Sequence, residues 1–204
     1  MSQTSEPQLA PPGAGLPKVE LAIGRVMFMM RRLAGNRVAH DARFEKQRQK
    51  IRELQAAVAA VGPEAASRRV LIKRLPGLED SSRYWSVWMT LDHLRIMHGA
   101  INRIIQTLGK GMQMPGQAST AAVKPSLLVT GAVVGEYEKS CDDLLATVRS
   151  VDNLRTPVRF THPWFGPLDA AGWHAMAAMH LGIHRAQIES ILAKLKENHG
   201  TTHV

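Results

Sequence analysis

Several features that define other protein classes are scarce in this sequence. The chain of 204 residues has one cysteine, Cys141, so it cannot form an intramolecular disulfide or a cysteine-rich zinc site. Aromatic residues make up only 5%, whereas methionine (10 residues) and alanine are frequent. This composition favours helix over sheet. Nine histidines are then the only plentiful ligands for a transition metal.

The chain also lacks a long hydrophobic run and a recognisable targeting segment. Its most apolar stretch, residues 21–30, is interrupted by Arg25 and followed by Arg31 and Arg32, and it is too short to span a bilayer. Residues 1–17 contain four prolines but neither the basic nor the apolar region of a signal peptide. We therefore expect a cytoplasmic protein with no membrane partner.

Positive charge is concentrated in the first part of the chain. The formal net charge is +9, and residues 1–75 carry 14 Lys/Arg against 6 Asp/Glu. Such a basic half can bind nucleic acid, or it can be the solvated face of a basic helix. No zinc finger, cold-shock or aromatic-and-basic RNA signature accompanies it. Nucleic acid is therefore a possible partner but not the favoured one.

Apolar residues recur at helical spacing along most of the sequence, which predicts an all-α protein. Residues 1–17 are expected to form a disordered tail, and residues 199–204 a second one. An additional N-terminal helix occupies 18–35, and a helical bundle domain occupies 36–198. A short extended piece is expected near 70–75, with no other sheet. The expected helices cover residues 18–34, 38–61, 81–108, 126–148 and 169–195, the last with Asp169 as its N-cap.

The first of these helices has an unusual apolar pattern. Apolar residues cover more than one of its faces, so we expect it to be largely buried, either by the bundle or by a second copy of the chain. They are Leu21, Ile23, Val26, Met27, Phe28, Met30 and Leu33.

Three histidines are candidates for one metal site. His180 and His184 are four residues apart, so their rings lie on one face of the last helix, about 5–6 Å apart at Cβ. His93 lies between Met89 and Met97 on the inward face of the 81–108 helix. All three are expected near the middle of their helices, where they can meet. Three neutral imidazoles around one ion leave a position for water or substrate.

Other polar residues have competing interpretations. Gln187, one turn after His184, could orient a ring or hold a water, or simply bond a backbone carbonyl. His162 could reach the mouth of the site or lie exposed in a loop. His98 and His174 should point away from the site. Cys141 is expected to be a small core residue rather than a nucleophile.

Two segments resemble signatures of the DinB-like (DinB/YfiT-like) metal-binding proteins. Residues 85–94 (WSVWMTLDHL) resemble the second-helix signature, and residues 180–188 (HLGIHRAQI) the last-helix signature. Residues 162–173 (HPWFGPLDAAGW) look like the approach to that helix in one subgroup. The resemblance covers roughly residues 38–197, so the helix at 18–34 is additional to it.

The resemblance implies a four-helix bundle, commonly up-down-down-up and often a homodimer. It also implies one divalent ion held by His93, His180 and His184, with Gln187 at a polar position that commonly follows the last ligand. Zinc or nickel is the first expectation, and manganese or iron the next. Some members of the family use a low-molecular-weight thiol for transfer or isomerisation.

These observations lead to three functional hypotheses. The first is a metal-dependent enzyme that activates a water or a low-molecular-weight thiol against a small-molecule substrate, by hydrolysis or thiol transfer. No general acid or base can be assigned from the sequence. The second is a helical bundle that binds a metal or a small ligand without catalysis. The third is nucleic-acid binding through the basic half.

Overall fold

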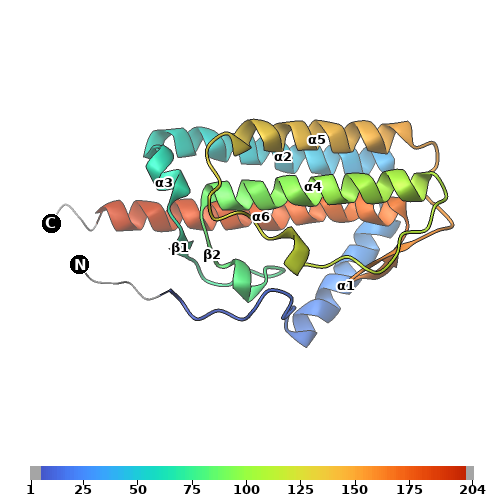
Figure 1. Ribbon diagram of the computed structural model, residues 1–204, viewed down its shortest axis with the longest axis horizontal. Coiled ribbons are helices and arrows are strands. Elements are labelled where there is room, and N and C mark those ends of the chain that lie inside the picture. Colours follow the sequence, from blue (N-terminus) through green and yellow to red (C-terminus); the bar gives the residue numbers. More distant parts are fainter. Residues whose placement is uncertain (1–5, 201–204) are drawn as a thin grey trace.

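The computed structural model describes residues 6–200, except for the side chains of 59–61 and 198–200, and this part of the chain is mainly helical (Figure 1). The helices are α1 (Lys18–Leu33), α2 (Arg37–Val61), α3 (Pro63–Ser67), α4 (Val87–Gly109), α5 (Val133–Ser150) and α6 (Ala170–Gly200). Two short 3₁₀ helices, η1 (Asp80–Ser82) and η2 (Ala121–Val123), lie in the connections. No helix among the described residues combines the length and the apolar character that a membrane crossing needs.

Helices α2, α4, α5 and α6 form the four-helix bundle that the sequence predicts. The chain runs in one direction through α2, returns through α4, keeps that direction in α5 and reverses in α6 (Figure 1). This is the expected up-down-down-up order. Residues 110–132 form a crossover, which runs back along the bundle and connects the end of α4 to the start of the parallel helix α5. Helix α4 packs against α5 and α6, and α2 packs against α6.

The bundle core is apolar and closely filled. Phe44 of α2, Ile101 of α4, Tyr137 of α5 and Leu181 of α6 have no exposed surface. Each of these residues lies three, four or seven positions from other buried residues of its helix. This spacing forms the apolar stripe from which the helix is predicted. Burying this stripe supplies the main stabilisation of the bundle.

Helix α4 begins six residues later than the expected residue 81. The side chain of Ser86 caps it by accepting a hydrogen bond from the Met89 backbone (3.1 Å). Just before the cap, β2 (Tyr84–Trp85) pairs antiparallel with β1 (Val70–Leu71). Trp85 is therefore a strand residue, although its apolar side chain continues the helical pattern.

Helix α5 also begins later than expected, at Val133 instead of residue 126. Residues 126–132 belong to the crossover, and Leu127 and Leu128 are exposed. The backbone N–H of Ser126 donates to Asp92 (2.9 Å), which holds this segment against α4 outside any helix.

A second ribbon, near the end of the bundle, was not expected. Strand β3 (Phe160–His162) pairs antiparallel with β4 (Gly166–Leu168). Gly166 has φ of 73°, a conformation that favours glycine after the Pro-Trp-Phe turn. The ribbon leads directly into α6, where Asp169 accepts a hydrogen bond from the Gly172 backbone (2.8 Å) and so acts as the predicted N-cap.

Helix α1 crosses the bundle diagonally, and the bundle covers only one side of it, so of the two covers expected for this helix the bundle is not the main one (Figure 1). Phe28 is its only buried residue, and its ring stacks on Phe165 with 4.5 Å between centroids. The Arg25 guanidinium donates to the Trp164 carbonyl (2.6 Å). Glu20 accepts hydrogen bonds from Arg74 and from the Gly77 backbone. Helix α1 therefore holds the β3–β4 ribbon and the 74–77 segment with one face and leaves the other uncovered.

The two expected tails are described only in part. Residues 6–17 form no helix or strand, and the Ala10 backbone donates to Asp80 (2.8 Å). Residues 1–5 and 201–204 lie outside the described residues.

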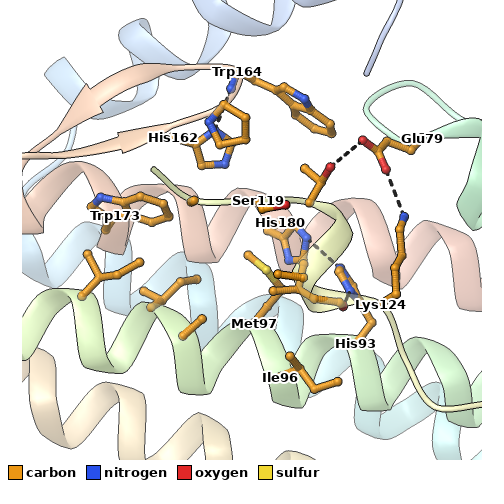
Figure 2. Close-up of a pocket in the computed structure, with 18 of the residues that line it drawn as sticks. Glu79, His93, Ile96, Met97, Ser119, Lys124, His162, Trp164, Trp173 and His180 are labelled. Carbon is orange, nitrogen blue, oxygen red and sulfur yellow. Dashed lines mark hydrogen bonds and ion pairs between the residues drawn. The ribbon is translucent and has the colours of Figure 1, made fainter. Parts of the chain in front are cut away.

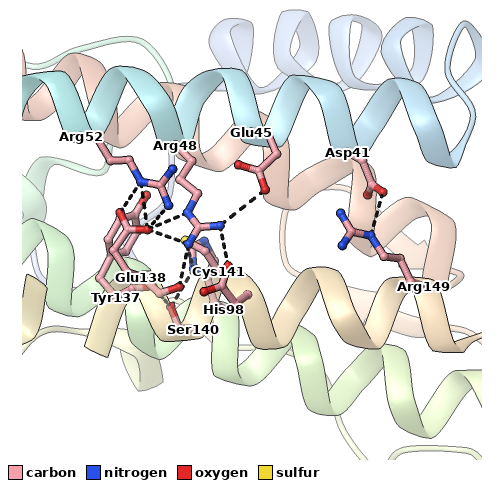
Figure 3. A network of polar contacts seen from close by, with 11 residues as sticks. Asp41, Glu45, Arg48, Arg52, His98, Tyr137, Glu138, Ser140, Cys141 and Arg149 are labelled. Carbon is pink, nitrogen blue, oxygen red and sulfur yellow. Dashed lines mark hydrogen bonds and ion pairs between the residues drawn. The ribbon is translucent and has the colours of Figure 1, made fainter. Parts of the chain in front are cut away.

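A buried arginine joins α2 to α5 (Figure 3). Arg48 is only 4% exposed and donates to Glu138 (2.7 Å) and Asp142 (2.7 Å), and also to the Glu138 carbonyl (3.1 Å). Arg52 reaches the same Glu138 from the next turn of α2, but 42% of its side chain is exposed.

We predict that Arg48→Ala lowers the free energy of unfolding by about 2–3 kcal/mol, because it removes buried charge-assisted hydrogen bonds to Glu138 and Asp142 together with the packing of the arginine stem. Arg52→Ala is the matched control, since it removes a solvent-exposed ion pair to the same carboxylate and should cost less than about 1 kcal/mol. Urea titrations of both variants measure the difference. Equal losses would contradict the assignment of Arg48 as the main link.

The buried histidine His98 lies next to this network (Figure 3). Its Nδ1 is 3.0 Å from the Ser140 hydroxyl oxygen, which itself donates to the Tyr137 carbonyl. Nδ1 of His98 therefore carries the ring proton and donates a hydrogen bond to the Ser140 hydroxyl oxygen. Burial, helped by the nearby charge of Arg48, lowers the pKa of His98 to about 3.

This pKa gives a pH dependence of stability that can be measured. The unfolded His98 has a pKa of about 6.5, so near pH 5 it gains a proton on unfolding that the folded side chain does not hold. Between about pH 6.5 and pH 3 the unfolded state therefore binds more protons than the folded state. As a result, the free energy of unfolding falls as the pH is lowered through this range. In His98→Gln, the slope of unfolding free energy against pH should drop by about 1.4 kcal/mol per pH unit near pH 5. Parallel curves for the two proteins would mean that folded His98 is already charged.

Candidate metal centre

Three histidines from two helices meet inside the bundle (Figure 2 shows two of them, His93 and His180). The Nε2 atom of His180 lies 3.2 Å from Nε2 of His93 and 3.1 Å from Nε2 of His184. His93 comes from α4, and the other two come from adjacent turns of α6. These are the three residues that the sequence suggests as ligands, and the described residues contain no other such group of potential metal ligands.

The position of His93 along its helix differs from the expectation. Because α4 begins at Val87, His93 lies in its second turn and not near its middle. It still meets His180 and His184, since α4 runs antiparallel to α6 and its early turns lie beside the middle turns of the longer helix.

Hydrogen bonds at Nδ1 orient two of the three rings. Nδ1 of His93 lies 2.6 Å from the carbonyl oxygen of Val123, at the end of η2. Nδ1 of His184 lies 2.6 Å from Oε1 of Gln187, whose Nε2 donates to the Ser82 carbonyl (2.7 Å). Both acceptors are carbonyl oxygens, so each Nδ1 carries a proton and each Nε2 presents a lone pair to the centre.

The third ring, His180, has no such support. Its Nδ1 is buried and has no hydrogen-bond partner among the described residues. It is held instead by its neighbours on α6 and by the two other rings, whose centroids lie 5.1 Å and 4.4 Å away.

Burial keeps the three imidazoles neutral. Removal from water lowers the pKa of His93 to about 4, and the pKa values of His180 and His184 lie well below the ordinary value for the same reason. Mutual repulsion between the rings adds to the effect at His180 and His184. Trp85 contributes to the burial, since its ring stacks on that of His184 with 6.1 Å between centroids. The neutral form is the one that binds a metal ion.

A cavity of about 290 Å³ opens beside the three rings (Figure 2). Its walls are mostly apolar and come from α4, the crossover and the β3–β4 ribbon. Apolar lining residues include Met97, Ile101, Ile104, Met114, Phe160 and Trp173.

His162 lines this cavity instead of lying exposed in a loop. It belongs to β3, is 7% exposed and accepts a hydrogen bond at Nδ1 from the Trp164 backbone (3.1 Å). Burial lowers its pKa to about 4. Of its two interpretations from the sequence, the structure favours the one in which His162 faces the site.

A charged pair at the rim was not found from the sequence. Lys124 donates to Glu79 (3.0 Å) and to the hydroxyl groups of Ser81 and Ser82, and Thr120 donates to the other oxygen of Glu79 (2.9 Å). These residues lie in connections with no periodicity, about 40 residues apart, so no spacing in the sequence brings them together.

The residues expected to lie away from the site do so. His98 contacts Ser140, and Nε2 of His174 lies 2.9 Å from Asp41. Cys141 is fully buried, and burial raises the pKa of its thiol to about 12, which removes it as a nucleophile.

Comparisons with known proteins agree with this architecture. A family model described as the DinB superfamily matches residues 43–188, a range that includes the three histidines and Gln187 but not α1. No curated protein matches the chain. The crystal structure of TT2238, a four-helix bundle protein, is similar in fold, with 19% sequence identity and a TM-score of 0.54 over 76% of this chain and 98% of that one. The chain therefore belongs to the DinB superfamily, with α1 placed ahead of the matched bundle.

Proposed function

We propose that the protein is a metal-dependent enzyme in which His93, His180 and His184 bind one divalent ion and the adjacent cavity takes a small-molecule substrate. The observation that carries the proposal is the convergence of three imidazoles, in which Nε2 of His180 lies 3.1–3.2 Å from Nε2 of both His93 and His184. Nitrogen ligands around a tetrahedral zinc ion lie about 3.3 Å apart, given Zn–N bonds of about 2.0–2.1 Å.

The chemistry of the donor set also fits a cation. Lone pairs at Nε2 of His93 and His184 both face Nε2 of His180, which can donate a hydrogen bond to only one of them. Imidazole ligands suit zinc and nickel, and also iron, whereas manganese prefers the oxygen ligands that this centre lacks. Zinc or nickel is therefore the proposed ion.

Such an ion would supply a Lewis acid that lowers the pKa of a bound water or thiol, which serves hydrolysis or thiol transfer. The chain's own groups have separate tasks. Val123 and Gln187 fix two ligand rings, and Trp85 and the apolar walls exclude water. His162 lies on the cavity wall and is neutral at pH 7. Because its Nδ1 accepts a hydrogen bond from the Trp164 backbone, its Nε2 carries the ring proton and can donate a hydrogen bond to a bound substrate.

The alternative is a bundle that binds a metal or a small ligand without catalysis. One observation favours it: Glu79 is the only carboxylate that lines the cavity among the described residues, and Lys124 and Thr120 already engage both of its oxygens. A centre that binds zinc or nickel tightly but turns over neither ester nor thiol substrates would support this alternative.

We expect His93→Ala, His180→Ala and His184→Ala each to abolish stoichiometric metal binding, because two imidazoles cannot replace a three-ligand set. His98→Ala and His174→Ala are the matched controls, since both remove a buried histidine of the same bundle outside the centre. Elemental analysis of the purified proteins, with far-UV circular dichroism to confirm folding, measures the outcome.

Added zinc or nickel should also raise the melting temperature of the unsubstituted protein, because an ion that binds only the folded state must stabilise it. Metal retained by all three ligand variants, or no metal and no thermal shift in the parent protein, would overturn the proposal.

Gln187 provides a finer test of how the centre is built. We predict that Gln187→Ala weakens metal affinity about 10–100-fold, because the hydrogen bond that orients His184 is lost. Gln187→Glu keeps an acceptor for Nδ1 of His184 and should restore part of the affinity. Gln106→Ala, which removes a glutamine hydrogen-bonded to Thr147 elsewhere on the bundle, should leave it unchanged. Competition with a chelator gives the affinities.

A further inference from the structure

Helix α1 presents a row of apolar side chains to solvent. Its members are Val19, Ile23, Val26, Met30 and Leu33, and each is between 56% and 73% exposed. We call these five residues the α1 stripe. Met27 and Met29, each 47% exposed, lie on either side of it.

The spacing of the α1 stripe is that of a helix-pairing seam. Successive members are four, three, four and three residues apart, which is the 3.5-residue repeat of the a and d positions in a coiled coil. A repeat of 3.5 keeps a narrow row facing one partner helix along its whole length.

The charges of α1 also favour a protein partner over a membrane. An interfacial helix uses basic residues on its polar face to contact lipid headgroups. Of the four basic residues on α1, the chain itself engages two, since Arg25 bonds the Trp164 carbonyl and Arg32 pairs with Asp169 (2.9 Å).

The positions that flank the stripe carry no basic residue, so two copies can approach without repulsion between like charges. In heptad terms these flanking e and g positions hold Glu20, Ala22, Met27, Met29 and Ala34.

We propose that the α1 stripe binds the α1 stripe of a second copy of this chain, so that the protein is a two-fold symmetric dimer. A single stripe that is self-complementary and uncharged is what a two-fold interface requires. Together with Met27 and Met29 it exposes roughly 700 Å² of apolar surface, close to the ~800 Å² that each partner buries in a stable complex. This proposal is independent of the metal.

The proposed interface lies close to the candidate metal centre. The inner face of α1 holds the β3–β4 ribbon through Phe28 and Arg25. A groove of about 470 Å³ between α1 and α6 shares His162, Trp164 and His180 with the cavity over the three rings. A second copy seated on α1 would therefore border the site from this side.

The oligomeric state tests the proposal directly. The full chain should be a dimer by light scattering and sedimentation at tens of micromolar. The double substitution Val26→Glu with Met30→Glu should raise the dimer dissociation constant by about 100-fold or more, because it places charges in the seam. Leu128→Glu is the matched control, since it alters a residue that is 88% exposed in the crossover and should leave the dimer intact.

Cross-linking locates the seam. Val26 is the central member of the stripe, so it meets its own copy whether the two helices run parallel or antiparallel. Val26→Cys should form an intermolecular disulfide on mild oxidation, and the buried Cys141 does not compete. Leu33→Cys alone should cross-link in a parallel pair, and a mixture with Val19→Cys in an antiparallel one.

Two results would overturn the proposal. The first is a monomer at all concentrations tested, and co-sedimentation of that monomer with anionic phospholipid vesicles would assign the α1 stripe to a lipid surface instead. The second is a dimer that the double substitution leaves unchanged.

Discussion

Removing three imidazole rings from water is the constraint on which much of this structure depends. An unpaired polar nitrogen in a core costs about 1–3 kcal/mol, so each ring needs a partner or a ligand. The crossover brings the Val123 carbonyl to His93, and Gln187 connects His184 to the Ser82 carbonyl. The connections before and after α4 are therefore held in position partly by the hydrogen bonds that their carbonyl groups accept from the bundle core.

The bundle and the three candidate ligands could be predicted because both rest on short-range periodicity. The i, i+4 spacing of His180 and His184 and the inward face of His93 follow from helix geometry alone. The rim pair Glu79–Lys124 and the Val123 carbonyl lie in irregular segments, where no repeat relates sequence to position. The sequence places the start of α4 too early because Trp85 is apolar in the helical register, although its backbone pairs in a strand. The sequence leaves open whether the bundle or a second copy covers α1, since apolar content does not reveal whether a partner belongs to the same chain.

Part of the uneven charge of the sequence has an internal explanation. Arg48 and Arg52 on α2 pair with Glu138 on α5, and Arg32 pairs with Asp169 at the start of α6. These three arginines of the first part of the chain are thus matched by acidic residues of the second part. The pairs tie the two halves together, and these arginines need no nucleic acid as a partner.

The hydrogen bond between His93 and Val123 is made by a main-chain oxygen. Other residues at position 123 would offer the same carbonyl, so a change of this side chain does not by itself alter the orientation of the ring. What is constrained is the path of the crossover, since adding or removing a residue between 110 and 123 would carry the oxygen away from Nδ1. Among related chains, a conserved loop length would therefore mark this support for the centre, while an alignment of residue identities would miss it.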